Sequence, residues 1–345
     1  MEFPTQSSPY LPAASGVNRL MLRVMLALVP AMLLMFWYFG WGVLFNLGLA
    51  GLTAIGAEAL MLMARRRPVI ATLYDGSALL TGLLLAMTLP PLAPWWLPVL
   101  GAGFAIVVAK QLYGGLGYNP FNPAMVGFVV LIISFPLQMT LWPPPTGLLS
   151  ADAMGLVDTV RMIFGGVLPD GRTLDSLTMA TPLDTAKTQL GLDYTWTEIA
   201  TRSLIGHFGG YGWEWINLAC LAGGLWLWRT RTIHWQIPAG MLGALFVTSL
   251  LFFIADSDSF GSPMFHLFSG ATMLGAYFIA TDPVSAATTP RGRIYYGAGI
   301  GVITYVIRTW GGYPEGLAFA VLLMNMAAPT IDYYTQPRVF GHEEK

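Results

Sequence analysis

The chain has 345 residues, of which 55% are hydrophobic and only 10% are charged, and its formal net charge is −1. Soluble domains carry about 25% charged residues, so this composition indicates a membrane protein. The net charge argues neither for nor against any partner, and we expect no nucleic acid. One cysteine, Cys220, and four scattered histidines exclude a disulfide framework and a Cys-based metal centre. We therefore predict no metal site in this chain.

Residues 1–19 are polar and rich in Pro and Ser, without the features of a signal peptide, and we expect a cytoplasmic tail. About 20 apolar residues span a bilayer as a helix. The predicted fold is an all-α polytopic membrane protein with about ten transmembrane helices. The expected segments are 20–39, 42–64, 76–90, 94–112, 122–141, 212–229, 237–255, 262–281, 294–309 and 314–333. Residues 334–345 would form a second cytoplasmic tail.

Two of these segments, 76–90 and 294–309, are short for a straight span, and the second contains Gly297, Gly299 and Gly301. Short or glycine-interrupted segments are typical of discontinuous helices that line a site. These two segments are therefore candidates for discontinuous helices, and the sequence does not tell which helices are broken.

Basic residues predict the orientation, because Lys and Arg gather in the cytoplasmic loops of membrane proteins. With the N-terminus inside, 12 of the 17 basic residues fall at cytoplasmic ends. They are Arg19, Arg23, Arg65, Arg66, Arg67, Lys110, Arg229, Arg231, Arg291, Arg293, Arg338 and Lys345. The long loop 142–211 is then periplasmic, and the chain is expected in a bacterial inner membrane.

An internal repeat relates the two halves of the chain, 20–141 and 212–333. Ala78, Gly82, Thr88 and Pro90 recur 193 positions later as Ala271, Gly275, Thr281 and Pro283. Each half holds five expected helices, and because five is odd the halves must have opposite topology. Inverted repeats place binding sites near the interface between the halves.

The connecting loop 142–211 carries Asp175-Ser-Leu-Thr178-Met-Ala-Thr181, followed by Pro182. The pattern Asp-x-x-Thr-x-Ala-Thr resembles the flavinylation signal of the Rnf and Nqr respiratory complexes, in which FMN is joined through its phosphate to the last Thr, here Thr181. Pro182 favours extended backbone at Thr181, which presents the hydroxyl to a transferase. Met179 stands where this pattern usually has Gly. The alternative is an ordinary exposed turn.

A second string, Ser269-Gly-Ala-Thr272, fits the four-residue core of this signal better than Thr178–Thr181 does. It lies inside the expected segment 262–281, however, and position 266 is His where the signal has Asp. Its small residues recur in the first half as Gly76-Ser-Ala. Close helix packing explains this string, so we predict that Thr272 is not modified.

Three further residues are candidates for function. Asn119 and Asn122 precede segment 122–141, where a helix N-terminus could attract a flavin phosphate, although simple helix capping explains Asn122 and Pro123 equally well. Glu58 lies within segment 42–64, and a carboxylate inside the membrane is by default a functional candidate. Glu58 is a candidate for an H⁺ or Na⁺ pathway. Its alternatives are protonation or pairing with another subunit.

The whole chain resembles the NqrB/RnfD family, and in particular the RnfD-type membrane subunits of Rnf complexes. The resemblance rests on Ser8-Pro-Tyr10, Gly117–Met125, Thr178–Leu183, Phe268–Gly275 and Thr281-Asp-Pro283. It implies covalent FMN on Thr181, bound riboflavin, and a complex that couples electron transfer between ferredoxin and NAD to H⁺ or Na⁺ movement. It also implies membrane, flavin and iron–sulfur subunits as partners, and a flavin transferase.

Two other functions stay open from the sequence. The NqrB component of the Na⁺-translocating NADH:quinone reductase is similar but usually longer at its N-terminus. A solute channel or carrier would also suit ten helices in inverted repeats, because fold does not decide function. The flavin motif on an exposed loop distinguishes a flavin-carrying subunit from a carrier or a pure scaffold.

Overall fold

The computed structural model describes residues 16–148, 154–169 and 171–336. Ser8-Pro-Tyr10, one of the stretches that carry the family resemblance, lies outside these ranges, as do most residues of the two expected tails. The described residues form helices and no strand, with two isolated β-bridges, Trp142 to Met179 and Ile205 to Gly210.

Helices cover the expected segments, although several are divided. The first half contains α1 (Val17–Phe39), α2 (Trp41–Ala64), α3 (Val69–Leu73), α4 (Ser77–Ala86), α5 (Trp96–Phe104), the π-helix η1 (Ala105–Gln111), α6 (Pro123–Ser134) and α7 (Pro136–Thr140). The second half contains α12 (Trp213–Arg229), α13 (Gln236–Ala255), α14 (Pro263–Phe268), α15 (Thr272–Leu274), the π-helix η2 (Gly275–Ile279), α16 (Pro290–Trp310) and α17 (Leu317–Thr335). The loop between the halves folds into α8 (Leu156–Gly165), α9 (Leu174–Leu177), α10 (Pro182–Leu190) and α11 (Trp196–Ala200).

Four of the described helices, α1, α2, α13 and α17, are long and apolar enough to cross a membrane. Their outward faces carry exposed apolar side chains such as Leu33, Leu52 and Ile254. In water this would be costly, but lipid tails solvate such faces. The number of crossings made by the shorter helices stays a prediction.

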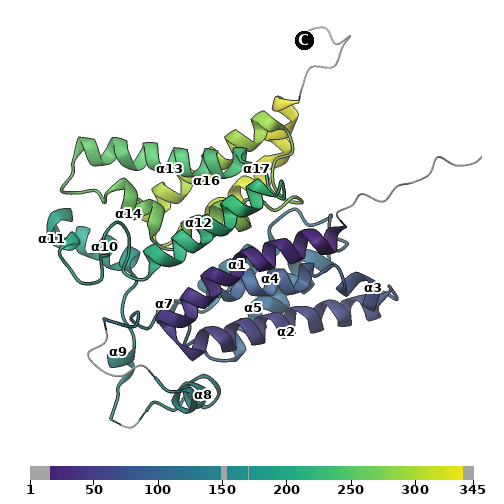
Figure 1. Cartoon of the computed structure of the whole chain (residues 1–345), viewed down its shortest axis with the longest axis horizontal. Coiled ribbons are helices and arrows are strands. Elements are labelled where there is room, and N and C mark those ends of the chain that lie inside the picture. The colour runs from purple at the N-terminus through teal and green to yellow at the C-terminus, as the bar shows by residue number, and fades with distance from the viewer. Residues whose placement is uncertain (1–15, 149–153, 170, 337–345) are drawn as a thin grey trace, which may run out of the picture.

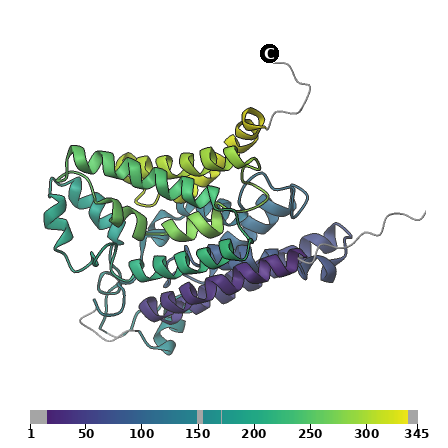
Figure 2. The ribbon, with the colours of Figure 1, turned by 45° about the horizontal axis from the view of Figure 1, so that its top comes forward.

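The two halves lie side by side, with α1 of the first packed along α12 of the second (Figure 1). Figure 2 shows the same pair from another side. The start of α1 and the end of α17 lie at one end of the bundle, and the connecting helices α8 to α11 lie at the other. Helices α6 and α17 also pack together across the halves, so the core is shared.

Helix α16 is unbroken over 21 residues, so the expected interruption at 294–309 is wrong. Its glycines instead let it approach α13: a Cβ on Gly297 or Gly301 would collide with the carbonyl oxygens of Ile237 and Met241. Small residues that allow backbones to meet are typical of helix contacts in membranes. The glycines therefore serve packing, and the helix keeps its hydrogen bonds.

The broken segment is 262–281, which the apolar pattern had predicted to be continuous. Helix α14 ends at Phe268, Ser269 is extended (φ −116°, ψ 154°), and Gly270 has φ +60° before α15 begins. The sequence conceals this break because hydropathy measures apolar length and not backbone continuity. A break at such depth needs partners for the freed backbone groups, which other segments supply. Segment 122–141 is likewise divided, at Phe135 before Pro136.

Candidate functional site

Thr181 is the residue before the first turn of α10, and not part of a featureless loop as the sequence suggested. Its backbone is extended (φ −65°, ψ 160°), as Pro182 predicted. The Thr181 Oγ1 accepts a hydrogen bond from the Asp184 N–H at 3.2 Å. Thr181 thus caps a nine-residue helix, with Pro182 at its first position.

The residues before Thr181 leave it open to another protein. Met179 and Ala180 are exposed, and the Met179 N–H donates to the Trp142 carbonyl at 2.8 Å, which holds this stretch extended. Asp175 is exposed on the short helix α9, and Thr178 closes that helix by donating to the Leu174 carbonyl. Asp175 and Thr178 therefore shape the approach to Thr181 and do not contact its hydroxyl.

Thr181 lines a narrow slot of about 90 Å³ between the two halves. Met125 and Phe128 come from the first half, and Trp213 and Leu317 from the second. Trp142 closes one side, with its ring centroid 5.1 Å from that of Trp213. The slot is apolar, and Asp184 and Glu315 are its acidic lining residues.

Helix α10 is fixed in place by Lys187, which lies six residues beyond the capping residue Thr181. The Lys187 ammonium donates to the carbonyl oxygens of Ile307, Gly311 and Tyr313 at the end of α16. Burial lowers the pKa of Lys187, and burial raises the pKa of Asp184, which the nearby Lys187 partly offsets. The connecting segment is thereby anchored to the second half.

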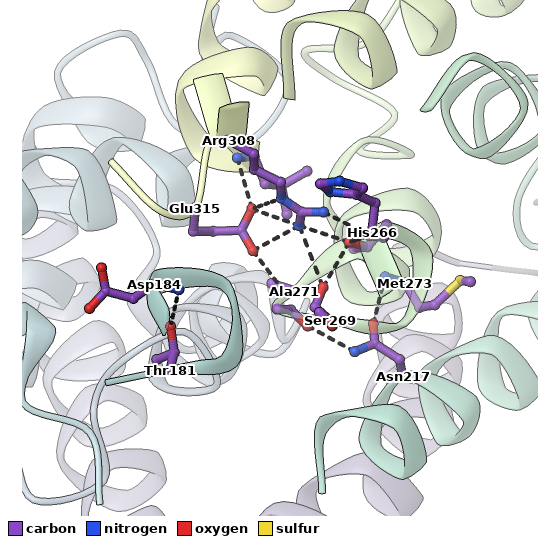
Figure 3. Close-up of polar contacts among 12 residues, drawn as sticks. Thr181, Asp184, Asn217, His266, Ser269, Ala271, Met273, Arg308 and Glu315 are labelled. Atoms are coloured by element: carbon purple, nitrogen blue, oxygen red, sulfur yellow. Dashed lines mark hydrogen bonds and ion pairs between the residues drawn. The ribbon is translucent and has the colours of Figure 1, made fainter. Parts of the chain in front are cut away.

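A buried ion pair stabilises the broken segment behind this slot (Figure 3). Arg308 is 3% exposed and lies 2.9 Å from the Glu315 carboxylate. Its guanidinium also donates to the His266 carbonyl at 2.7 Å and to the Thr272 hydroxyl at 2.8 Å. Glu315 in turn accepts the Ala271 N–H at 3.0 Å. The pair therefore satisfies the backbone groups that the break frees.

Sequence reasoning missed both members of this pair, because it treated Arg308 only as a charge on the outer side and passed over Glu315. A signal was available. Arg308 lies at the end of an apolar run, and charges near apolar helices usually have a dedicated partner.

Thr272 is fully buried and its hydroxyl is already engaged. It donates toward the carbonyl oxygens of His266 and Ser269 and accepts from Arg308. The expectation of a continuous helix at Thr272 is wrong, since Thr272 begins α15 directly after the break. Its burial nevertheless separates it from the accessible Thr181.

Asn119 and Asn122 lie in a different cavity, of about 340 Å³, and are not brought together with Thr181. Asn122 caps α6 by accepting the Met125 N–H at 3.3 Å, as its position predicted. The Asn122 backbone N–H donates to the Asn325 Oδ1, and its side-chain amide donates to the Ile279 carbonyl; both acceptors belong to the second half. The Oδ1 of Asn119 is buried without a hydrogen bond.

Glu58 is 1% exposed and forms an ion pair with Lys110 at 2.6 Å. Pairing inside the chain was not among the alternatives drawn from the sequence. Lys110 itself was expected at a cytoplasmic helix end, but it is buried in η1. Within the described ranges, no three His, Cys, Asp or Glu residues are grouped as metal ligands.

Comparison with known proteins places the whole chain. The profile of the family described as "NQR2, RnfD, RnfE family" matches residues 4–341. Proteins named as the D component of an "Ion-translocating oxidoreductase complex" are similar over all of this chain: 53% identical in Aliivibrio salmonicida and 50% in Escherichia coli O127:H6, each aligned over its full length. The protein of that name from Ectopseudomonas mendocina is 54% identical, with 97% of its length covered. The chain therefore belongs to the NQR2, RnfD, RnfE family of membrane proteins.

Proposed function

We propose that this chain is the flavin-carrying membrane subunit of an Rnf-type ion-translocating oxidoreductase, with FMN joined through its phosphate to the Thr181 hydroxyl. The observation that carries the proposal is the position of Thr181: extended, half-buried directly after the exposed Met179 and Ala180, and lining a slot between the two halves. The chain is not catalytic alone. When bound, the flavin would accept electrons and pass them on.

The residues around Thr181 suit a phosphoester. The Asp184 N–H in the first turn of α10 donates to the Thr181 hydroxyl, and helix N-termini favour phosphate. The apolar and aromatic walls of the slot suit one edge of a flavin ring. At about 90 Å³ the slot is smaller than a typical ligand pocket, so the remainder of the ring would lie over the exposed Met179 and Ala180.

Riboflavin, which the family resemblance implies, has a candidate site in the second cavity. Its volume of about 340 Å³ lies in the range of small-molecule pockets. Tyr277 and Phe278 offer aromatic faces there, and Asn119 and Asn122 offer amides. The unpartnered Asn119 Oδ1 is the kind of group that a ligand would satisfy.

Glu58 supports the ion-translocating part of the proposal, because a carboxylate buried in the bundle is costly without a use. The partners would be the other membrane, flavin and iron–sulfur subunits, together with a flavin transferase. A solute carrier and a pure scaffold are the rivals, and neither explains the presented Thr181.

The test is an absorption spectrum of the denatured, washed chain isolated from its native membrane. We expect a flavin spectrum with about one flavin per chain, because a phosphoester survives unfolding. A colourless denatured chain would favour a carrier or a scaffold. Flavin that is released on denaturation would point to non-covalent binding alone.

We also propose a topology of five helices in each of two inverted halves, 20–141 and 212–333, in the bacterial inner membrane, with both tails inside and residues 142–211 in the periplasm. The placement of the start of α1 and the end of α17 at one end of the bundle, with α8 to α11 at the other, supports it. So do the two buried ion pairs, Lys110 with Glu58 and Arg308 with Glu315. Each contacts the third segment of its half: Lys110 through Ser77 at the start of 76–90, and Arg308 through Thr272 in the middle of 262–281.

Cysteine labelling of intact cells checks this orientation. Ser176 and Arg66 are both exposed, so a cysteine at either would be reachable by reagent. We expect a membrane-impermeant reagent to modify Ser176→Cys and to leave Arg66→Cys untouched until the membrane is opened. The reverse pattern would invert the topology.

A further inference from the structure

In the Glu58–Lys110 pair, one of the two carboxylate oxygens of Glu58 has no hydrogen-bond partner. The Glu58 Oε1 lies 2.6 Å from the Lys110 ammonium and accepts the Gln111 amide N–H at 2.7 Å. Gln111 is held in that orientation by Arg65, which donates to its amide oxygen at 3.1 Å. The other oxygen, Oε2, is buried and has no hydrogen bond. One half of a buried carboxylate is thus left unsatisfied, which calls for an explanation.

Lys110 stands between this carboxylate and the 340 Å³ cavity. Lys110 and Ser77 line the cavity, whereas Glu58 does not. The Lys110 ammonium also donates to the Ser77 hydroxyl at 2.7 Å. An ion in the cavity therefore meets the ammonium before it can reach Glu58.

A second carboxyl group, from the other half of the chain, lines the same cavity as Lys110. Asp282 of the second half lines the same cavity and interacts electrostatically with Lys110. Both Asp282 oxygens accept hydrogen bonds from its own turn, at Val284 and Ser285, so this carboxylate is held in place. The remaining ionisable or cationic lining residues of the cavity are His234, Tyr277 and Arg293.

A buried ion pair is a poor device for stability alone, because desolvation of the two charges offsets most of their attraction. The ammonium occupies the place that a small hard cation would take, beside carboxylate and hydroxyl oxygens. We propose that Lys110 is a tethered cation that fills the Glu58 site and is displaced toward Asp282 when Na⁺ or H⁺ enters. The proposal deepens the ion-translocating role proposed above and rests on it.

Displacement has a measurable consequence. An entering cation must compete with a tethered ammonium, so its apparent affinity is lowered and its release is speeded. Without the ammonium, Glu58 should bind the cation more tightly and release it slowly. When both the Lys110 ammonium and the Glu58 carboxylate are removed, there should be no cation-binding site.

The experiment uses the whole complex in proteoliposomes, with ²²Na⁺ uptake and a pH-sensitive dye as separate arms, each referred to the electrons transferred. The variants are Lys110→Met, Lys110→Arg, Glu58→Gln and the double variant Glu58→Gln/Lys110→Met. Arg229→Met is the control, because Arg229 is an exposed basic residue at the end of α12, outside this cluster. Flavin fluorescence under denaturing conditions is recorded for each, so that loss of the flavin is distinguished from loss of ion transport.

For Lys110→Met we expect at least a tenfold fall in the cation concentration that gives half-maximal turnover, with fewer ions moved per electron. Lys110→Arg should restore most transport. The double variant leaves no unpaired charge, so it should assemble with its flavin even if Lys110→Met does not, and it should move no ions. If the double variant loses ²²Na⁺ uptake, the cation is Na⁺; if it loses the signal of the pH-sensitive dye, the cation is H⁺. Normal transport by the double variant, or an unchanged cation dependence in Lys110→Met, would make the pair a structural one and overturn the proposal.

Discussion

Thr181→Ala should abolish covalent flavin completely, because no other group can replace the hydroxyl that forms the phosphoester. The fold should survive, since losing one helix cap costs only about 1 kcal/mol. The measurement is in-gel flavin fluorescence under denaturing conditions, followed by mass mapping of the peptide that spans residues 173–187. Thr181→Ser keeps both the hydroxyl and the cap, and should retain at least part of the modification.

Thr272→Ala is the matched control, since it removes the same group from the competing Ser-Gly-Ala-Thr string. Thr272 is fully buried and bonded to Arg308, so no transferase can reach it in the folded chain. Its covalent flavin should be normal, with some loss of stability. Met179→Gly should be neutral or slightly favourable, because Met179 points outward. Fluorescence that survives Thr181→Ala and vanishes in Thr272→Ala would overturn the site.

The sequence predicted local features of this site well where a single residue decides the backbone. Pro182 predicted the extended conformation of Thr181, and the Asn122-Pro123 pair predicted the cap of α6. Both depend on contacts within one turn of the chain. The helices also lie close to the expected apolar runs, because long apolar periodicity is a strong signal.

Features set by distant partners were not predictable. The break at Ser269–Ala271 is held by Arg308 and Glu315, about 40 residues later, so the run itself gives no sign of it. Gly297, Gly299 and Gly301 of α16 suggested an interruption, but Gly297 and Gly301 face the α13 backbone and Gly299 faces the Met324 side chain of α17. The pairing of Glu58 with Lys110 likewise spans 52 positions, and its detection needs the packing of η1 against α2.

Arg308→Met should be among the most destabilising single substitutions in the chain. It leaves the Glu315 carboxylate without its counter-charge and removes the guanidinium N–H groups that donate to the His266 carbonyl and the Thr272 hydroxyl. Removing one member of a buried ion pair costs about 3–5 kcal/mol, which is a large fraction of a typical total stability of roughly 5–15 kcal/mol. We expect a marked fall in the midpoint of thermal unfolding. The midpoint is measured by heating the protein in detergent and recording the remaining folded fraction by size-exclusion chromatography.

The companion variants assign this loss to the unpaired charge. Arg308→Met/Glu315→Gln removes both charges, and should recover a substantial part of the stability because the remaining groups are neutral. Arg202→Met is the control: Arg202 is exposed, its side chain donates to Gln189 and stacks over Tyr194, and its loss should cost less than about 1 kcal/mol. If Arg308→Met unfolds at the same temperature as Arg202→Met, the ion pair does not hold the break. The backbone of Ser269–Ala271 would then have to be stable through the Asn217 contacts to Gly270 and Met273 alone.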